Sequence, residues 1–309
     1  MILNPNQLTF EDKKFSMILY GAPGVGKTTL ALSAPNPVLI DFDKGVSRVK
    51  AYHRKPTIVC ETYEEVLKDI ASPDIRSFDT IIVDTGGSFV TYLQDWAMRE
   101  NPAVNKQKNG AISLKGFGAV KQEFIRFTNY VRTTLNKNII YIFHSDEQKD
   151  KDGNPQQRLL CEGAARNIVW QPTDFGGYVQ MIGDKRFVSF TPTQEYFAKG
   201  CYGIEGTFPI PTSTDSNNTF ITDLFGKAKK NISDEAEEFA PEQKKYDEAM
   251  AKAKEIIGSI KTLDECNDAI DKVKGIDHAL TSAKESASLL NAKAKELGFA
   301  LDKETKRYA

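Results

Sequence analysis

Between residues 15 and 230, short and almost continuous apolar runs alternate with stretches in which apolar residues recur every three or four positions. Continuous apolar runs of this length are typical of parallel strands covered on both faces, whereas the three-to-four spacing is typical of amphipathic helices. The runs predict five strands, at 15–20, 38–42, 57–60, 80–84 and 138–143. Strands that alternate with helices in this way predict an α/β domain with a mostly parallel central sheet.

A hairpin and a long helix are expected later in this region. Two apolar runs, 178–182 and 186–191, flank the turn-forming pair Gly183-Asp184 and predict a β-hairpin extension of the sheet. Ahead of the strand at 138–143, one apolar face of a helix is indicated by Val120, Phe124, Phe127, Val131 and Leu135.

The pattern changes near residue 230. An acidic stretch at 234–238 precedes Pro241 and predicts a linker or the start of a helix. Beyond it we expect a C-terminal α-helical appendage, a helical hairpin or small bundle, whose apolar seam packs on helix 242–260 of the same chain. Pairing of the seam with another molecule is the alternative. The seam has heptad spacing and consists of Ile276, Leu280, Ala283, Ala287, Leu290, Ala294 and Leu297.

Composition limits the cellular locations and the classes of partner expected for the protein. The 309 residues are 40% hydrophobic and 27% charged, as is usual for a folded protein, and the net charge of −1 provides no bulk attraction for nucleic acid. No apolar run is long enough to span a bilayer, and the four dispersed cysteines contain no CxxC pair. We therefore expect a cytoplasmic protein without a membrane partner, with domains at 1–230 and 231–309.

A phosphate-binding motif follows the first expected strand and precedes a helix expected at 28–33. The motif matches GxxxxGK[ST], in which glycines let backbone N–H groups converge on phosphate and the helix N-terminus adds its positive end. Lys27 is expected to bridge the β- and γ-phosphates, and the Thr28 hydroxyl to hold Mg²⁺. A glycine-rich turn without a ligand is the alternative. The residues expected to bind ATP are Gly21, Ala22, Pro23, Gly24, Val25, Gly26, Lys27, Thr28 and Thr29.

Carboxylates end two of the expected strands. The run at 78–84 ends in Asp84, and a carboxylate at this edge of a parallel sheet can orient Mg²⁺ beside a phosphate-binding loop. The next residue is Thr85, whereas many P-loop ATPases have a water-activating Glu there, so the general base is expected elsewhere. The strand at 38–42 leads to Asp41 and Asp43, which its alternation predicts to point the same way.

These motifs resemble those of the RecA-type recombinase ATPases, and most of all the phage-encoded P-loop proteins with a minimal RecA-like core that act in single-strand annealing. The resemblance implies a homo-oligomer with ATP at its subunit interfaces and Asp43 as the catalytic carboxylate, where the family more often has Glu. It implies that His144 senses the γ-phosphate; a polar cap of a strand end is the alternative. It also implies that Lys199 stabilises transition-state charge in the neighbouring subunit, with Arg186 as an alternative.

The same resemblance places loops for single-stranded DNA at 101–118 and 145–158. Lysines in mobile loops can track phosphates, glycines allow close approach of the backbone, and Phe117 is placed to stack on a base. An ordinary hairpin turn at 151–155 is the alternative for the second loop. The cations concerned are Lys106, Lys108, Lys115, Lys149, Lys151 and Arg158.

Three functions are compatible with these residues. The expected one is an ATP- and Mg²⁺-dependent RecA-like protein that acts on single-stranded DNA in phage-type recombination, annealing or replication. A small-molecule kinase is less well matched, because the segment 145–170 offers only Arg158 and Arg166 as lid arginines. A non-hydrolysing adaptor, whose C-terminal helices bind a replication or packaging partner, is favoured by the absence of Glu after Asp84.

Overall fold

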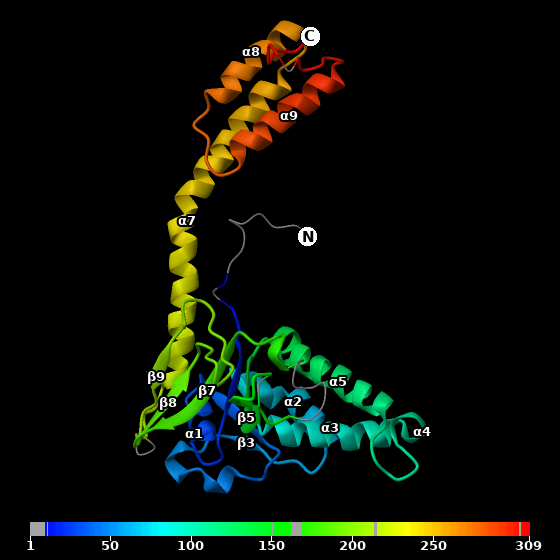
Figure 1. Ribbon diagram of the computed structural model, residues 1–309, viewed down its shortest axis with the longest axis vertical. Coiled ribbons are helices and arrows are strands. Elements are labelled where there is room, and N and C mark those ends of the chain that lie inside the picture. Colours follow the sequence, from blue (N-terminus) through cyan, green and yellow to red (C-terminus); the bar gives the residue numbers. More distant parts are fainter. Residues whose placement is uncertain (1–9, 11, 150, 162–168, 213–214, 303) are drawn as a thin grey trace. The chain divides into compact units, whose positions relative to one another are not determined.

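The computed structural model describes residues 10, 12–149, 151–161, 169–212, 215–302 and 304–309 (Figure 1). The chain forms two compact units. One is Glu11–Asn231, here called the α/β unit, and the other contains Ile232–Ala309, here called the helical unit. Each is described by itself.

The α/β unit contains the strands of one sheet, which has nine strands within the described residues. Their order is β3-β2-β4-β5-β1-β7-β8-β9, and β6 pairs with β5. The bounds are β1 Ser16–Gly21, β2 Pro37–Asp41, β3 Thr57–Ile58, β4 Thr80–Asp84, β5 Asn138–Lys149, β6 Pro155–Leu159, β7 Phe175–Ile182, β8 Lys185–Ser189 and β9 Thr207–Pro209.

The pairing confirms the expected fold class, an α/β P-loop core on a mostly parallel sheet. The neighbours from β3 to β7 in this order run parallel. The β7–β8 pair is the predicted antiparallel hairpin extension, and β9 continues it. β5 lies between β1 and β4, so the strands that carry the P-loop and Asp84 are separated by one strand.

The two longest helices confined to the α/β unit, α3 and α5, both follow β4. Helix α2 begins with a capping box in which Thr62 and Glu65 satisfy each other's backbone N–H groups. The bounds are α1 Lys27–Ala31, η2 Val46–Arg48, η3 Ala51–His53, α2 Tyr63–Ala71, η4 Pro73–Ser77, α3 Gly86–Glu100, α4 Pro102–Asn105, α5 Leu114–Asn129 and the π-helical turn η5 Tyr130–Thr134.

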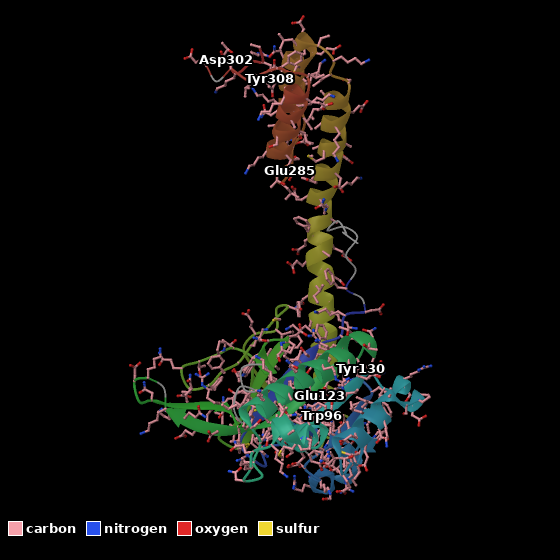
Figure 2. All side chains as sticks on the ribbon, turned by 90° about the vertical axis from the view of Figure 1, so that its right-hand side faces the viewer. Trp96, Glu123, Tyr130, Glu285, Asp302 and Tyr308 are labelled. Atoms are coloured by element: carbon pink, nitrogen blue, oxygen red, sulfur yellow. The ribbon has the colours of Figure 1, made fainter. Side chains whose placement is uncertain are left out.

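Helices α2, α3 and α5 pack their apolar residues against one face of the sheet in a single core. Phe89 of α3 lies near its centre, with its ring 4.9 Å from that of Phe127 on α5. The predicted apolar face of 120–135 is buried here at four of its five positions. Within this core Glu123 of α5, labelled in Figure 2, is buried and accepts a hydrogen bond of 2.5 Å from Tyr63.

Helix α7 (Phe220–Gly258) begins earlier than the acidic stretch suggested. Its first residues belong to the α/β unit, where the Ile221 N–H donates to Ser33 at 3.0 Å and Phe225 packs 5.1 Å from Phe15. The expectation of a linker or helix start before Pro241 is therefore wrong, because Pro241 lies inside α7. The Glu and Ala residues there are good helix formers.

The helical unit contains the rest of α7 together with α8 (Leu263–Lys274) and α9 (Ser282–Glu296). Their shared core confirms packing of the seam region on α7 within one chain, through residues such as Ala253, Ile257 and Leu290. The heptad interpretation is wrong in detail, since α9 buries Ser282 and Ser286 while Ala283 and Ala287 are exposed. Tyr308, labelled in Figure 2, closes this core and donates its N–H to Asn267 at 2.7 Å.

The two expected DNA loops are largely ordered secondary structure. β5 continues to Lys149 and pairs with β6, so residues 145–149 and 155–159 form a hairpin rather than a mobile loop. The alternative, an ordinary hairpin turn, is the better description. In 101–118, helix α4 and the start of α5 flank a short turn closed by a bridge between Lys106 and Ile112. Asp150 lies outside the described residues.

Candidate functional site

The P-loop leaves the carboxyl end of β1 in a conformation that only glycine supplies easily. Gly24 and Gly26 have φ angles of +76° and +91°, in the left-handed region where a Cβ is strained. At Gly21 a Cβ would stand 2.1 Å from the Val179 carbonyl oxygen of the neighbouring β7. The glycines at these positions are thus explained by the backbone conformation of the loop and by its close packing against β7.

Lys27 is held at the base of this loop. Its ammonium donates to the carbonyl oxygens of Gly21 at 3.0 Å and Ala22 at 2.8 Å, and it lies 3.5 Å from His144 Nδ1. Burial lowers the pKa of Lys27 to about 8, with the charge of Asp84 acting in the opposite direction. Burial, followed by the charge of Lys27, lowers the pKa of His144. An anion placed here would therefore meet a positioned cation beside a neutral imidazole.

Thr28 and Asp84 form the pair that the sequence assigned to a cation. The Thr28 hydroxyl donates to Asp84 Oδ2 at 2.7 Å. Burial raises the pKa of Asp84 to about 6, against the opposing effect of the Thr28 bond and with added repulsion from Asp41 and Asp43. A hydroxyl and a carboxylate, completed by phosphate oxygens and water, are the hard oxygen ligands that Mg²⁺ uses at nucleotide sites. The residues fit that ion.

Replacement of Asp84 by asparagine is expected to stabilise the ligand-free protein at pH 7.5. The pKa of Asp84 is raised by folding from 3.8, so the folded state binds more protons and its stability falls as pH rises through about 6. Asparagine carries no charge, and the gain is about 1–3 kcal/mol at pH 7.5. Denaturant unfolding of Asp84→Asn and wild type at pH 7.5 and pH 4 measures it. A gain that does not shrink at pH 4 contradicts this assignment.

Asp41 and Asp43 do not point the same way, contrary to the alternation argument. β2 ends at Asp41, whose buried carboxylate accepts the N–H groups of Gly45 and Val46, each at 2.9 Å. Asp43 lies in the following turn and its carboxylate lines the cavity above the P-loop. There it accepts the Ser88 hydroxyl at 2.7 Å. The strand alternation stops where the strand stops, so only Asp43 faces the nucleotide site.

One cavity of about 650 Å³ brings together most of the predicted site residues, but its lining does not include Gly21, Ala22, Val25 or Lys199. Asp43 also faces Arg48, at 3.3 Å, a residue on η2 that the sequence did not single out. No sequence motif marks Arg48, Lys50 or Ser88 as site residues. Their place in the site is recognised only in the structure, where the turn after β2 folds against α3. A larger cavity of about 890 Å³ lies in the helical unit and contains none of these groups. The residues of the smaller cavity that matter here are Gly24, Gly26, Lys27, Thr28, Thr29, Asp43, Arg48, Lys50, Asp84, Thr85, His144 and Arg186.

A family comparison agrees with this geometry. The family model described as an AAA domain (AAA_24) matches residues 13–202, which is more than half of the chain and includes the whole cavity lining. The chain belongs to this AAA domain family. It is accordingly a P-loop nucleotide-binding protein.

Two individual proteins that this AAA domain protein matches share little sequence identity with it. It is 23% identical over 211 residues to the SPbeta prophage-derived uncharacterized protein YorG of Bacillus subtilis (strain 168), covering 64% of this chain and 62% of that one. The chain thus spans less than two thirds of that relative's length. Among solved structures, the KaiC-like protein PH0186 from Pyrococcus horikoshii OT3 matches with 10% identity and a TM-score of 0.35, over 66% of this chain and 87% of that chain.

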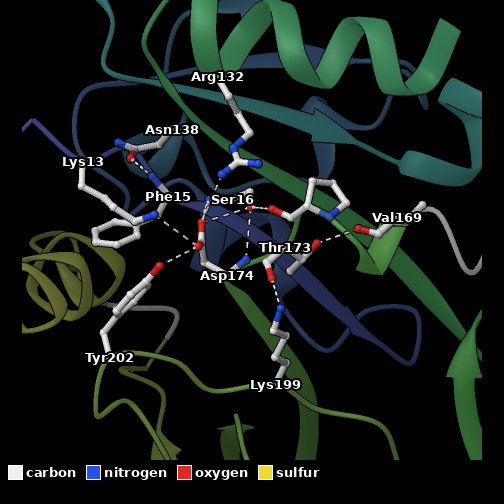
Figure 3. A network of polar contacts seen from close by, with 11 residues as sticks. Lys13, Phe15, Ser16, Arg132, Asn138, Val169, Thr173, Asp174, Lys199 and Tyr202 are labelled. Atoms are coloured by element: carbon white, nitrogen blue, oxygen red, sulfur yellow. Dashed lines mark hydrogen bonds and ion pairs between the residues drawn. The ribbon is translucent and has the colours of Figure 1, made fainter. Parts of the chain in front are cut away.

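Lys199 lies away from the AAA domain's cavity lining. Figure 3 shows its ammonium directed at the Thr173 carbonyl oxygen, which it contacts through a hydrogen bond. The adjoining Asp174 accepts the Ser16 N–H at 2.9 Å and the Tyr202 hydroxyl at 3.1 Å, so this cluster ties the start of β7 to β1. The action of Lys199 on a neighbouring subunit stays a prediction. Arg186, its alternative, lines the chain's own cavity.

Among the described residues, no helix has both the length and the apolarity to cross a membrane.

Proposed function

We propose that this AAA domain protein hydrolyses Mg²⁺-ATP and acts on single-stranded DNA in phage-type recombination, annealing or replication. The observation that carries the hydrolytic part is the presence of Lys27, the Thr28–Asp84 pair and Asp43 around one cavity. The P-loop supplies phosphate binding, the oxygen pair fits a divalent cation, and Asp43 adds a carboxylate that can accept a proton. A phosphate cradle, a divalent cation and a residue that acts on the nucleophile recur at sites that hydrolyse a phosphoanhydride.

Each residue has a defined task in this proposal. Lys27 and the P-loop N–H groups bind the phosphates, and Thr28 with Asp84 holds Mg²⁺, which neutralises phosphate charge when bound. Asp43 accepts the proton of the attacking water, and the Ser88 hydroxyl at 2.7 Å fixes the orientation of its carboxylate. His144, 3.5 Å from the Lys27 ammonium, is placed to respond to a change in the phosphates.

The continuity of β5 supports coupling to DNA. His144 lies within this strand, and the same strand runs on without interruption into the hairpin with β6. On this hairpin, Arg158 lies 3.9 Å from the centre of the half-exposed Phe197 ring, forming a cation–aromatic pair of the kind that contacts nucleic-acid bases and phosphates. A shift of His144 would reach this surface through a single stretch of backbone.

Phosphate release with and without oligothymidylate tests this function. We expect wild-type turnover of ATP to rise when the oligonucleotide is added. Removal of two hairpin cations by Lys149→Ala with Lys151→Ala is expected to weaken DNA binding and to reduce its salt slope by about one to two. Lys244→Ala with Lys245→Ala on α7 is the matched control and should change neither.

Other outcomes assign other functions. Phosphorylation of an added nucleoside monophosphate would replace the proposal with a kinase. Tight ATP binding without turnover would replace it with an adaptor, a function favoured by the ion pair that Arg48 makes with Asp43.

A further inference from the structure

Arg186 lies on β8 and reaches the P-loop of its own chain. A Cβ built on Gly26 would stand 2.3 Å from Arg186 Nη1, so the guanidinium lies directly against the glycine that precedes Lys27. Its other terminal nitrogen donates to the Pro211 carbonyl oxygen at 2.8 Å. The side chain thus lines the cavity, and its hydrogen bond to Pro211 holds the guanidinium in position.

We propose that Arg186 binds the phosphate chain of the nucleotide held by the same chain's P-loop, acting in cis. This inference rests on the proposed function in one respect, namely that the ligand of the P-loop is a nucleoside polyphosphate. A guanidinium presents several N–H donors in a plane and suits phosphate oxygens better than a point charge does. It would add a second cation to Lys27 around the phosphate site.

The backbone around Arg186 makes this placement rigid. Arg186 pairs with Met181 of β7, and its carbonyl accepts the Ile210 N–H at 2.9 Å. β7 pairs in turn with β1, where Val179 lies opposite Gly21 at the start of the P-loop. Two strand pairings therefore connect the arginine to the loop, and the guanidinium is positioned by the same sheet that positions the phosphate site.

The net charge of the cavity lining favours an anionic ligand such as a nucleoside polyphosphate. Its lining contains four lysine or arginine side chains and two aspartates, a formal net charge of +2 when histidines are not counted; these groups are Lys27, Arg48, Lys50, Arg186, Asp43 and Asp84. A fully ionised nucleoside triphosphate with one Mg²⁺ has a charge of −2. Without Arg186 the lining would carry only +1, so this residue supplies half of the excess that attracts the ligand.

Nucleotide affinity and melting temperature of Arg186→Ala test the proposal. We expect the variant to bind ATP and ADP about 10- to 100-fold more weakly, as for loss of hydrogen bonds to a charged group. Arg186→Lys should recover part of the loss. Lys185→Ala removes an exposed cation from the same strand, outside the cavity lining, and should bind as wild type does. A lower melting temperature with unchanged affinity would show a purely structural role and overturn the proposal.

Mixing two variants separates action in cis from action in trans. Lys27→Ala chains retain Arg186 but lack the phosphate lysine, whereas Arg186→Ala chains retain Lys27. If Arg186 acts on its own chain, turnover of the mixture equals the sum of the two separate variants. A rise above that sum overturns the proposal, because it requires the arginine of one chain to act at the P-loop of another. Failure of the wild type to bind ATP would instead overturn the proposed function.

Discussion

Replacement of Lys27 by alanine is expected to abolish measurable binding of ATP. The ammonium is already positioned by two P-loop carbonyls, so the wild type loses little freedom when phosphates arrive, and alanine leaves those phosphates without their principal cation. The two charge-assisted hydrogen bonds expected between the ammonium and phosphate oxygens are lost, which corresponds to about 100- to 10,000-fold in affinity. Equilibrium binding of a fluorescent ATP analogue measures the change.

The fold should tolerate this substitution. Lys27 is a buried cation whose pKa is lowered by burial, so its removal relieves a desolvation cost, and we expect the melting temperature to be retained or raised. Lys68→Ala, on the last turn of α2, is a control that should leave both binding and stability unchanged. ATP binding by Lys27→Ala with wild-type affinity would show that the P-loop is not the nucleotide site.

Replacement of Asp43 by asparagine is expected to separate binding from turnover. Asparagine keeps an oxygen that can accept the Ser88 hydroxyl, but its amide cannot take a proton from water. Loss of a general base lowers the rate by about 10²- to 10⁴-fold, while the phosphate contacts remain. Single-turnover phosphate release, with ATP binding measured in parallel, reports both quantities.

Asp41→Asn provides the matched comparison two residues away. The two oxygens of Asp41 accept the N–H groups of Gly45 and Val46, so the NH₂ group of an asparagine would face one of these N–H donors, at a cost of about 1–3 kcal/mol of stability. We expect this variant to unfold more readily and to retain turnover per folded molecule. Normal turnover by Asp43→Asn would show that another group accepts the proton.

The parts of the fold that follow from periodicity were predictable. β1, β2 and β4 are buried along their whole lengths, and such strands read as continuous apolar runs. Less was predictable where two patterns overlap. In α9 the alanines at 283 and 287 continue the apolar spacing, but the fold buries the small serines at 282 and 286 instead. Alanine and serine are both small enough to be buried or exposed, so spacing alone could not show which face of α9 is buried.

The candidate site likewise contains residues that the sequence predicts and residues that only the structure reveals. The P-loop and Asp84 are local motifs, in which neighbouring residues carry the chemistry, and the sequence was enough to find them. Arg48 and Ser88 approach Asp43 from η2 and α3, and Arg186 approaches Gly26 from β8, more than 150 residues away in the chain. Their roles depend on sheet order and on the path of a turn, and no spacing in a single sequence encodes these.

The uninterrupted course of β5 limits how this protein can change. Side chains alternate between the two faces of a strand, so the orientation of each hairpin residue is set by whether it lies an odd or an even number of positions beyond His144. Insertion of two residues there would lengthen the hairpin and preserve which side chains face which way. Insertion of one would exchange its two surfaces. A change by an even number of residues therefore keeps the two surfaces of the hairpin, whereas a single added residue keeps them only where it forms a β-bulge.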